Sequence, residues 1–218
     1  MNRAEEDYIK SIYELTFEKN KTLIKANDLA DRFGYSDQSV NEMIKKLESK
    51  HLVNFIPYKG ISLTSKGKKV AIRMIRAHRI WEVFLTSKLG YSWESVHEDA
   101  ERLEHATSDE VIEKLYQFLG EPKFCQHGNP IPDLKGKMEI PETHTLLESE
   151  INDVFELTRV LDHKDLLIYL NDIKLPLYGR ITVIGKDNLN EIISFTHHNQ
   201  THQSGYKIAK MLFGKIIK

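Results

Sequence analysis

Apolar positions in the first fifty residues recur at helical spacing in three segments. The first two segments, 4–18 and 25–33, are amphipathic, and Gly34 follows the second, where a helix commonly ends in the left-handed conformation. Ser36 is suited to cap the third segment, which keeps its apolar face to about Lys50. Two short helices joined by a glycine-containing turn predict a helix-turn-helix.

A β-hairpin is predicted immediately after the third helix. Residues 52–63 form two short extended runs on either side of Lys59 and Gly60. A hairpin in this place is the wing of a winged helix, and the long helical pattern that continues to Leu89 would lead out of this unit. We therefore place a winged helix-turn-helix domain at residues 1–73.

The remainder of the chain changes from helical to extended patterns. Helical spacing returns between Ser92 and Leu119 without an obvious core of its own, and residues 121–141 are rich in proline, glycine and lysine. From about Thr145, β-type runs surround one short helix. The sequence therefore predicts a mainly α protein with a small β domain, in which a helical dimerisation domain at 74–140 precedes a β-barrel at 145–218.

The net charge of the chain is close to zero, which limits how it could bind a nucleic acid. The 218 residues include 31 lysines and arginines against 32 acidic residues, so a polyanion would have to be met by a local basic patch. The chain has no apolar run long enough to span a bilayer and no apolar start typical of a signal peptide. Its single cysteine, Cys125, excludes an intramolecular disulfide. We expect a cytoplasmic protein without a membrane partner.

The predicted helix-turn-helix carries polar and basic side chains suited to DNA. The second helix of such a motif enters the major groove, where glutamine and asparagine pair with adenine and serine donates or accepts. The base-contact candidates are Ser36, Gln38, Ser39 and Asn41. Lysines that would neutralise phosphates are Lys25, Lys45 and Lys59, with Lys46, Lys66, Lys68 and Lys69 nearby. Alternatively, the winged helix binds a protein and the lysines form a solvated face.

Histidines and carboxylates gather at helical spacing in the middle of the chain. His97, Glu101, Glu104 and His105 follow one another at spacings of four, three and one, so a helix projects all four within an arc of roughly 100°. Further ligand-type residues are the pair His78 and Glu82, Asp7 in the first predicted helix, and Cys125 and His127 in a loop. First-row divalent ions bind such mixed sets. The sequence therefore predicts a metal site.

The donor types favour manganese over softer ions. A set led by Asp7, Glu101 and Glu104 is rich in oxygen, which suits Mn²⁺, whereas the thiolate of Cys125 favours iron or zinc. Each group also has a plainer interpretation, because His/Glu pairs four apart are common surface ion pairs and a lone cysteine is commonly a small buried hydrophobe. Three further histidines in a polar loop are expected to be solvated: His197, His198 and His202.

The order of these parts and several local motifs resemble the diphtheria toxin repressor family, in its three-domain manganese- or iron-responsive branch. The resemblance is carried by Glu6-Asp7-Tyr8-Ile9, Leu63-Thr64-Ser65-Lys66-Gly67, Arg76-Ala77-His78-Arg79, the row from His97 to His105, and Cys125-Gln126-His127-Gly128-Asn129-Pro130-Ile131-Pro132. It covers about the first 135 residues, and the β-rich tail resembles the family's SH3-like (FeoA-type) domain. The resemblance implies a metal-activated homodimeric repressor of metal-uptake genes that binds a palindromic operator, not an enzyme with a small-molecule substrate.

The resemblance also implies two metal centres per subunit. The primary centre would use Asp7, Glu101, Glu104 and His105, joined by Cys125 or His127. The second would use His78 and Glu82, with His97 as a further candidate, Cys125 or His127 bridging, and Asp162 or Asp165 reaching in from the C-terminal domain. Iron-type members have cysteine at the position of Glu101, so this glutamate favours Mn²⁺, with Fe²⁺ and Zn²⁺ as alternatives. Short manganese-responsive members have glutamate where this chain has Lys10, so their paired-metal arrangement is not expected here.

Two other functions remain open at this stage. One is a metal-independent winged-helix regulator, in which the row of histidines and glutamates only packs or pairs charges. The other is a metal-dependent hydrolase, against which the chain has no HExxH motif, phosphate-cradling loop or nucleophile–base pair.

Overall fold

The computed structural model describes residues 1–18, 21–139 and 141–217, and the chain divides into two compact units. Unit 1 comprises Met1–His78, Glu101–Lys114 and Pro132–Lys137, and unit 2 comprises Arg79–Ala100, Leu115–Ile131 and Met138–Lys218. The middle of the chain is thus shared between the two units. The three domain boundaries drawn from the sequence stay a prediction.

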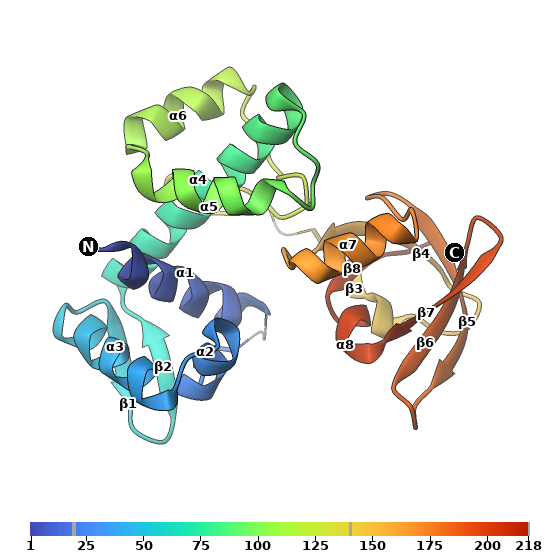
Figure 1. Ribbon diagram of the computed structural model, residues 1–218, viewed down its shortest axis with the longest axis horizontal. Coiled ribbons are helices and arrows are strands. Elements are labelled where there is room, and N and C mark those ends of the chain that lie inside the picture. The colour runs from blue at the N-terminus through green and yellow to red at the C-terminus, as the bar shows by residue number, and fades with distance from the viewer. Residues whose placement is uncertain (19–20, 140, 218) are drawn as a thin grey trace. The chain divides into compact units, whose positions relative to one another are not determined.

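Unit 1 begins with the winged helix-turn-helix that the sequence predicts (Figure 1). Its elements are α1 (Arg3–Glu18), α2 (Ala26–Phe33), α3 (Asp37–Ser49), β1 (Val53–Ile56) and β2 (Gly60–Leu63). The two strands pair antiparallel and form the wing. Aliphatic side chains of all three helices and of the wing share one core.

Local signals account for the turn between α2 and α3. Gly34 adopts φ +66° and its N–H donates to the carbonyl of Ala30 at 2.8 Å, which ends α2. Ser36 then caps α3, because its side chain accepts a hydrogen bond from the N–H of Ser39. The apolar face of α3 is buried, so the opposite face of this helix is exposed.

Three further helices follow the wing: α4 (Ser65–Leu89), α5 (Val96–Ala106) and α6 (Asp109–Phe118). In unit 1, two arginines of α4 hold the later segments. Arg73 pairs with Asp109 at 2.7 Å, and Arg76 donates to the carbonyl of Pro132 at 2.7 Å and to Glu113 at 2.8 Å. None of the helices in the part of the chain that the structure describes is long and apolar enough to cross a membrane.

The C-terminal part of unit 2 is the β domain that the sequence predicts. Its strands are β3 (His144–Thr145), β4 (Val154–Val160), β5 (Arg180–Asp187), β6 (Ile192–His197), β7 (Gln200–Gly205) and β8 (Leu212–Ile217). They form one antiparallel sheet in the order β3-β8-β4-β5-β6-β7. Within the described residues no pairing joins β3 to β7, so the SH3-like domain that the sequence predicts as a small β-barrel is an open six-stranded antiparallel sheet.

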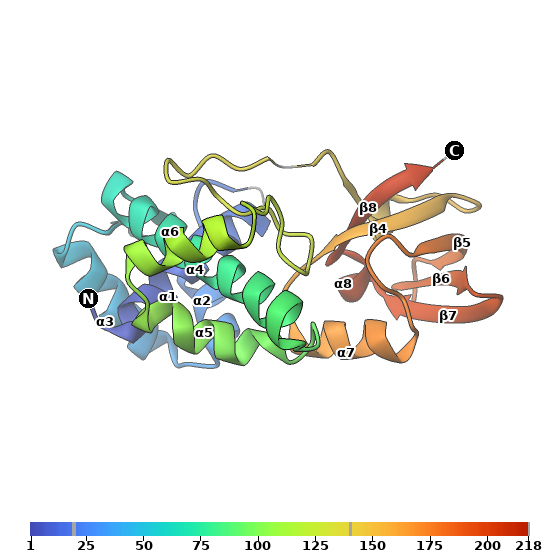
Figure 2. The ribbon, with the colours of Figure 1, turned by 90° about the horizontal axis from the view of Figure 1, so that it is seen from above.

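Short helices complete the core of the β domain (Figure 2). These are the 3₁₀ turn η1 (Leu146–Glu148), α7 (Lys164–Asp172) and α8 (Tyr206–Ala209). Alternate strand residues such as Phe155 and Phe195 are buried together with three leucines of α7. The connection between β4 and α7 is short, and it carries Asp162.

Candidate metal centres and DNA-binding face

Four ligand-type side chains from α1 and α5 converge in unit 1. One donor atom from each of Asp7, Glu101, Glu104 and His105 lies within 4.8 Å of the others. Asp7 projects from the second turn of α1, and the other three share one face of α5, as their spacing predicts. We call this group the first centre. It joins the first helix of the winged helix to α5.

Glu6 orients His105 within the first centre. Nδ1 of His105 lies 2.6 Å from Glu6 Oε2, and its Nε2 lies 2.8 Å from Asp7 Oδ1. When Nδ1–H donates to Glu6, Nε2 turns a lone pair toward the Asp7 carboxylate. Both facing atoms are buried, and neither has a hydrogen-bond partner among the residues described. Two lone pairs at this distance repel unless a proton or a metal ion lies between them, so this pair fits a protonated imidazole or a bound metal ion.

Burial has the largest influence on the pKa of Asp7. It raises the pKa of this carboxyl group, while His105 opposes the shift and Glu101 adds to it. A buried carboxylate beside a second carboxylate is costly to ionise. A divalent ion in the first centre would relieve that cost.

Lys10 also points into the first centre. Its Nζ donates to Glu101 Oε1 at 2.6 Å and to the two carboxylate oxygens of Glu104 at 2.9 and 3.0 Å, and lies 3.2 Å from His78 Nδ1. Burial disfavours the ammonium, but Glu104, Glu14 and Glu101 outweigh it and raise the pKa of Lys10. The carboxylates around Lys10 therefore favour its charged form.

His78 contacts the first centre as well. Its Nδ1 lies 2.6 Å from Glu104 Oε2 and 3.8 Å from Glu101 Oε1. The sequence placed His78 in the second centre, one helical turn before Glu82 on α4. That assignment stays a prediction. The contact with Glu104 could not be predicted from the spacing of residues on α4, because Glu104 lies on α5.

A second group of ligand-type side chains lies in unit 2. Donor atoms of Glu82 on α4 and of Cys125 and His127 in the loop after α6 lie within 4.8 Å of one another, and all three residues are buried. Asp162 approaches from the β domain, with its Oδ2 3.9 Å from His127 Nδ1 and 2.7 Å from His97 Nδ1. We call these five residues the second centre. The four ligand-type residues of α5 are therefore divided between the two centres, because His97 lies in the second centre and the other three lie in the first.

The backbone of Trp93 fixes the tautomer of His127. Nε2 of His127 lies 2.9 Å from the Trp93 carbonyl oxygen, which only accepts hydrogen bonds, so this nitrogen carries a hydrogen. Nδ1 then faces Glu82 Oε1 at 3.1 Å. Burial opposes a positive charge on His127, but Glu82, Cys125 and Asp162 outweigh burial and raise its pKa to about 12. The second centre therefore attracts a proton or a metal ion to Nδ1.

Cys125 is a buried free thiol in the second centre. Burial raises its pKa, with Glu82 adding to the shift and His127 and Arg79 opposing it. A thiol with a raised pKa becomes a ligand only when a metal displaces its proton. The donor set of one thiolate, one imidazole and carboxylates fits a first-row divalent ion.

The loop 125–131 is fixed against strand β4. The N–H of Val160 donates to the carbonyl of His127 at 2.9 Å. Gly128 adopts φ +76°, and a Cβ at this position would overlap the carbonyl oxygen of Thr158. Glycine is required here for both reasons, and its close approach holds the two loop ligands in place.

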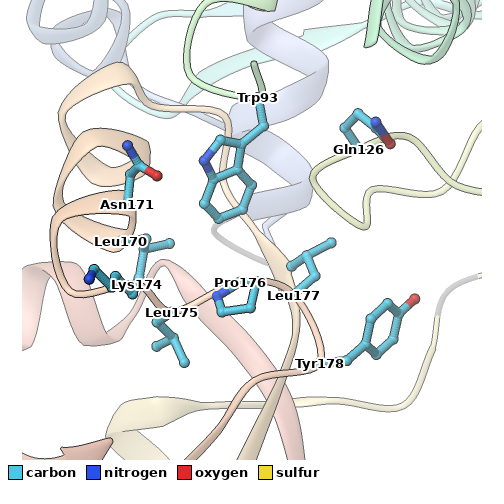
Figure 3. Close-up of a pocket in the computed structure, with 9 residues that line it drawn as sticks. All are labelled: Trp93, Gln126, Leu170, Asn171, Lys174, Leu175, Pro176, Leu177 and Tyr178. Carbon is cyan, nitrogen blue, oxygen red and sulfur yellow. The ribbon is translucent and has the colours of Figure 1, made fainter. Parts of the chain in front are cut away.

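A pocket of about 600 Å³ adjoins the second centre in unit 2 (Figure 3). It is lined by Trp93, Gln126, Leu170, Asn171, Lys174, Leu175, Pro176, Leu177 and Tyr178. The ring of Trp93 points into this space, and the carbonyl of the same residue holds His127. Trp93 therefore lines the pocket and also contacts the second centre.

The loop histidines differ from the solvated group expected from the sequence. His197 is buried, and its two ring nitrogens lie 2.9 Å from the Arg180 carbonyl and 3.0 Å from the Lys174 carbonyl. The expectation was wrong for this residue, because the fold brings two distant backbone acceptors to its ring. His198 is exposed and His202 is partly buried.

The start of α3 exposes the side chains predicted to contact bases. Ser36, Gln38, Ser39 and Asn41 are all exposed, and Lys45 is exposed one turn later. Gln38 donates to Glu42 at 3.1 Å, and the hydroxyl groups of Ser36 and Ser39 lie 3.0 Å apart. These contacts are within α3 or its cap, so the polar face is available for a ligand.

Exposed side chains also flank α3 in the wing and before α2. Lys25 is exposed at the start of α2, and Lys59 is exposed in the turn of the wing. Beside Lys59, Tyr58 is fully exposed and adopts φ +63°. The sequence pattern did not single out Tyr58. The alternation of apolar and polar residues identifies strand positions, whereas Tyr58 lies in the turn between the strands.

In unit 1 a carboxylate of α1 pairs with Lys46 of α3 and with Lys50, which follows the last residue of α3. Nζ of Lys50 and of Lys46 lie 2.6 and 2.9 Å from Glu5 Oε1, and Glu5 is buried. Lys50 and Lys46 lower the pKa of Glu5 to about 2. Helix α1, which carries Asp7, is thereby tied to the exposed polar helix α3.

Two protein families match this chain in succession. Residues 1–61 match the family described as "Iron dependent repressor, N-terminal DNA binding domain", and residues 64–133 match "Iron dependent repressor, metal binding and dimerisation domain".

Individual proteins match over longer stretches. The diphtheria toxin repressor of Corynebacterium jeikeium is 30% identical over 193 residues, which are 88% of this chain and 75% of that protein. The iron-dependent repressor IdeR of Mycobacterium leprae is 35% identical over 129 residues, 59% of this chain and 55% of that protein. A solved structure described as a manganese-dependent transcriptional repressor in complex with manganese is 30% identical, with a TM-score of 0.86 over 98% of this chain and 100% of that one.

Proposed function

Because this chain belongs to the diphtheria toxin repressor family of metal-dependent, DNA-binding transcriptional repressors, we propose that Mn²⁺ at two centres per subunit activates it. The activated homodimer would bind a palindromic operator and repress genes for metal uptake. Fe²⁺ and Zn²⁺ are the alternative ions.

The composition of the first centre carries this proposal. Asp7 comes from α1 of the winged helix, and its partners Glu101, Glu104 and His105 come from α5. A metal activates only if it binds the DNA-competent conformation more tightly than the others. Ligands divided between these two helices would supply that difference, and linkage requires DNA to raise metal affinity by the same factor.

The Glu5 contacts support a route from the metal to the DNA. Asp7 and Glu5 lie on the same turn of α1, and Glu5 pairs with Lys46 of α3 and with Lys50 directly after α3. A metal that holds Asp7 would therefore also restrict α3. In a dimer this sets the spacing of the two recognition helices, which must match the half-sites of the operator.

Manganese is the proposed ion because three of the four donors in the first centre are carboxylates. The thiolate of Cys125 in the second centre favours Fe²⁺ or Zn²⁺, which is why these are the alternative ions. A similar protein is described as manganese-dependent and in complex with manganese.

The DNA contacts are proposed from the exposed face of α3. Gln38 and Asn41 would bond base edges, Ser36 and Ser39 bases or phosphates, and Lys45 phosphates. Lys25 and Lys59 would add phosphate contacts at the edges of this face.

Fluorescence anisotropy of a labelled promoter fragment tests the function directly. Mn²⁺ should tighten binding by about tenfold or more, which corresponds to about 1.4 kcal/mol of coupling. His105→Ala should abolish this effect, whereas Glu110→Ala, at an exposed ion pair with Lys114, should leave it unchanged. Equal binding in chelator would make the protein a metal-independent regulator and overturn the proposal.

A further inference from the structure

Three aromatic rings form a row in unit 1, from the core of the winged helix to its surface. The rings of Tyr8 and Phe33 stack with their centroids 4.6 Å apart and their planes inclined by 17°, and those of Phe33 and Tyr35 stack at 5.7 Å and 14°. Tyr8 is buried on α1, Phe33 is the last residue of α2, and Tyr35 is 56% exposed. The row therefore connects α1, α2 and the turn before α3, and it ends in solvent.

The exposed end of this row is held by both backbone and side-chain contacts. The N–H of Tyr35 donates to the carbonyl of Ala30 at 3.2 Å, beside the hydrogen bond from Gly34 that ends α2. Its ring lies against Phe33, so the side chain has fewer rotamers open to it than a tyrosine without such a contact. Burial raises the pKa of Tyr8 and Tyr35 adds to the shift, which agrees with the closeness of the two phenols.

Packing does not account for the hydroxyl group of Tyr35. A phenylalanine in its place would stack on Phe33 equally well, and the hydroxyl group has no hydrogen-bond partner among the residues that the structure describes. Tyr35 directly precedes Ser36, the cap of α3, and so borders the exposed polar face that carries Gln38 and Asn41. A tyrosine hydroxyl donates one hydrogen bond, and phosphate oxygens are frequent acceptors for such side chains in complexes with DNA.

We propose that Tyr35 is a DNA-contact residue whose hydroxyl group donates to a backbone phosphate beside the recognition helix, and that the ring of Phe33 holds it in the orientation for this contact. The inference rests on the proposed DNA-binding function and adds to it a residue and a kind of contact. A donor to phosphate fixes the position of α3 on the duplex without reading the base sequence. Because tyrosine is neutral, this contact releases no counterion, in contrast to a lysine contact.

Tyr35→Phe tests the inference, because it removes only the hydroxyl group and keeps the stack. The full-length protein in Mn²⁺ is titrated with a labelled duplex that it selects from a random-sequence pool, and with an unrelated duplex of the same length. Tyr35→Phe should weaken binding to both duplexes by about tenfold or more, as for loss of a hydrogen bond to a charged group. The salt slope and the unfolding temperature should not change. Tyr178→Phe, which alters an exposed tyrosine of the β domain, should match its parent.

Two further measurements locate the contact and test the role of the stack. Single phosphates of the selected duplex are replaced by uncharged methylphosphonates. At the phosphate that Tyr35 contacts, the replacement should cost the parent more affinity than it costs Tyr35→Phe, because the two changes remove the same hydrogen bond. Phe33→Leu removes the middle ring and should weaken binding to both duplexes, whereas Phe33→Tyr keeps the ring and should bind as the parent does.

The outcomes separate this inference from the function on which it rests. If Tyr35→Phe binds both duplexes as its parent does while Asn41→Ala weakens binding to the selected duplex, the inference is overturned and the DNA-binding function stands. A loss confined to the selected duplex would make Tyr35 a base contact and overturn the assignment to phosphate. A lower unfolding temperature with unchanged affinity would overturn the inference in favour of a role in stability alone. If the parent binds neither duplex in Mn²⁺, the proposed function fails and the inference with it.

Discussion

Asp162 Oδ2 lies 2.7 Å from His97 Nδ1, although 65 positions separate the two residues. The contact brings a carboxylate of the β domain to the second centre, where Asp162 also lies 3.9 Å from His127 Nδ1. The β domain is therefore positioned to contribute a ligand and not only to pack against its neighbour.

Asp162→Ala should weaken metal binding at the second centre by about tenfold to a hundredfold, whether Asp162 ligates the ion directly or orients His97. Calorimetric titration of Mn²⁺ should resolve this loss, with the first centre unchanged. Asp172→Ala is the matched control, because Asp172 is an exposed aspartate at the end of α7. Equal losses in both variants would contradict a specific role for Asp162 and point to general electrostatic attraction.

Gly128→Ala should destabilise the protein by about 2–4 kcal/mol and displace the loop that carries Cys125 and His127. The added Cβ would overlap the Thr158 carbonyl, at φ +76°. Gly120→Ala separates the two causes, because Gly120 has the same φ of +76° and an added Cβ there would have no neighbour within 4 Å. It should cost only about 1 kcal/mol. Thermal unfolding in chelator compares the two, and similar losses would remove the steric argument.

Glu5→Gln should destabilise the protein at neutral pH by about 1–3 kcal/mol, because it weakens charged hydrogen bonds to Lys46 and Lys50. The folded pKa of Glu5, about 2, lies below its ordinary value of 4.5. Its stabilisation is therefore complete above about pH 4.5 and is lost as the pH falls toward 2.

Unfolding temperatures of the parent and Glu5→Gln proteins, measured in chelator across this pH range, should converge as the solution becomes more acidic. The control is Glu110→Gln, since Glu110 forms an exposed pair with Lys114 and exposed pairs contribute little. A difference that does not change with pH would show that the carboxylate charge of Glu5 is not the cause.

Elements with a local cause could be predicted from the sequence. Gly34 and Ser36 fix the turn of the winged helix through their own backbone and side-chain hydrogen bonds. The spacing of Glu101, Glu104 and His105 placed them on one face of a helix, as the structure has them. Spacing could not indicate that His97 serves a different cluster, because the partner Asp162 comes from a distant segment.

The sequence could not predict contacts made by groups that carry no distinctive signal, such as a backbone carbonyl or a single lysine. Trp93 holds His127 through a backbone carbonyl, a group that every residue has. Lys10 follows Asp7 by three positions on α1 and so shares its face, but a search for metal ligands passes over lysine. The open sheet of the β domain depends on pairing between distant strands, which alternation along each strand does not determine.

Asn41→Ala and Lys45→Ala should weaken operator binding in different ways. Asn41 is exposed near the start of α3, and loss of a bidentate base contact costs about 1–3 kcal/mol on the preferred sequence and little on unrelated DNA. Loss of Lys45 should weaken binding to both DNAs alike and reduce the salt slope by about 1, because one fewer phosphate is neutralised. Anisotropy titrations in saturating Mn²⁺ at several salt concentrations measure both effects, with Lys114→Ala as the control. If Lys45→Ala left the salt slope unchanged, this face of α3 would not lie against the phosphates, and the recognition helix would have to enter the groove by another face.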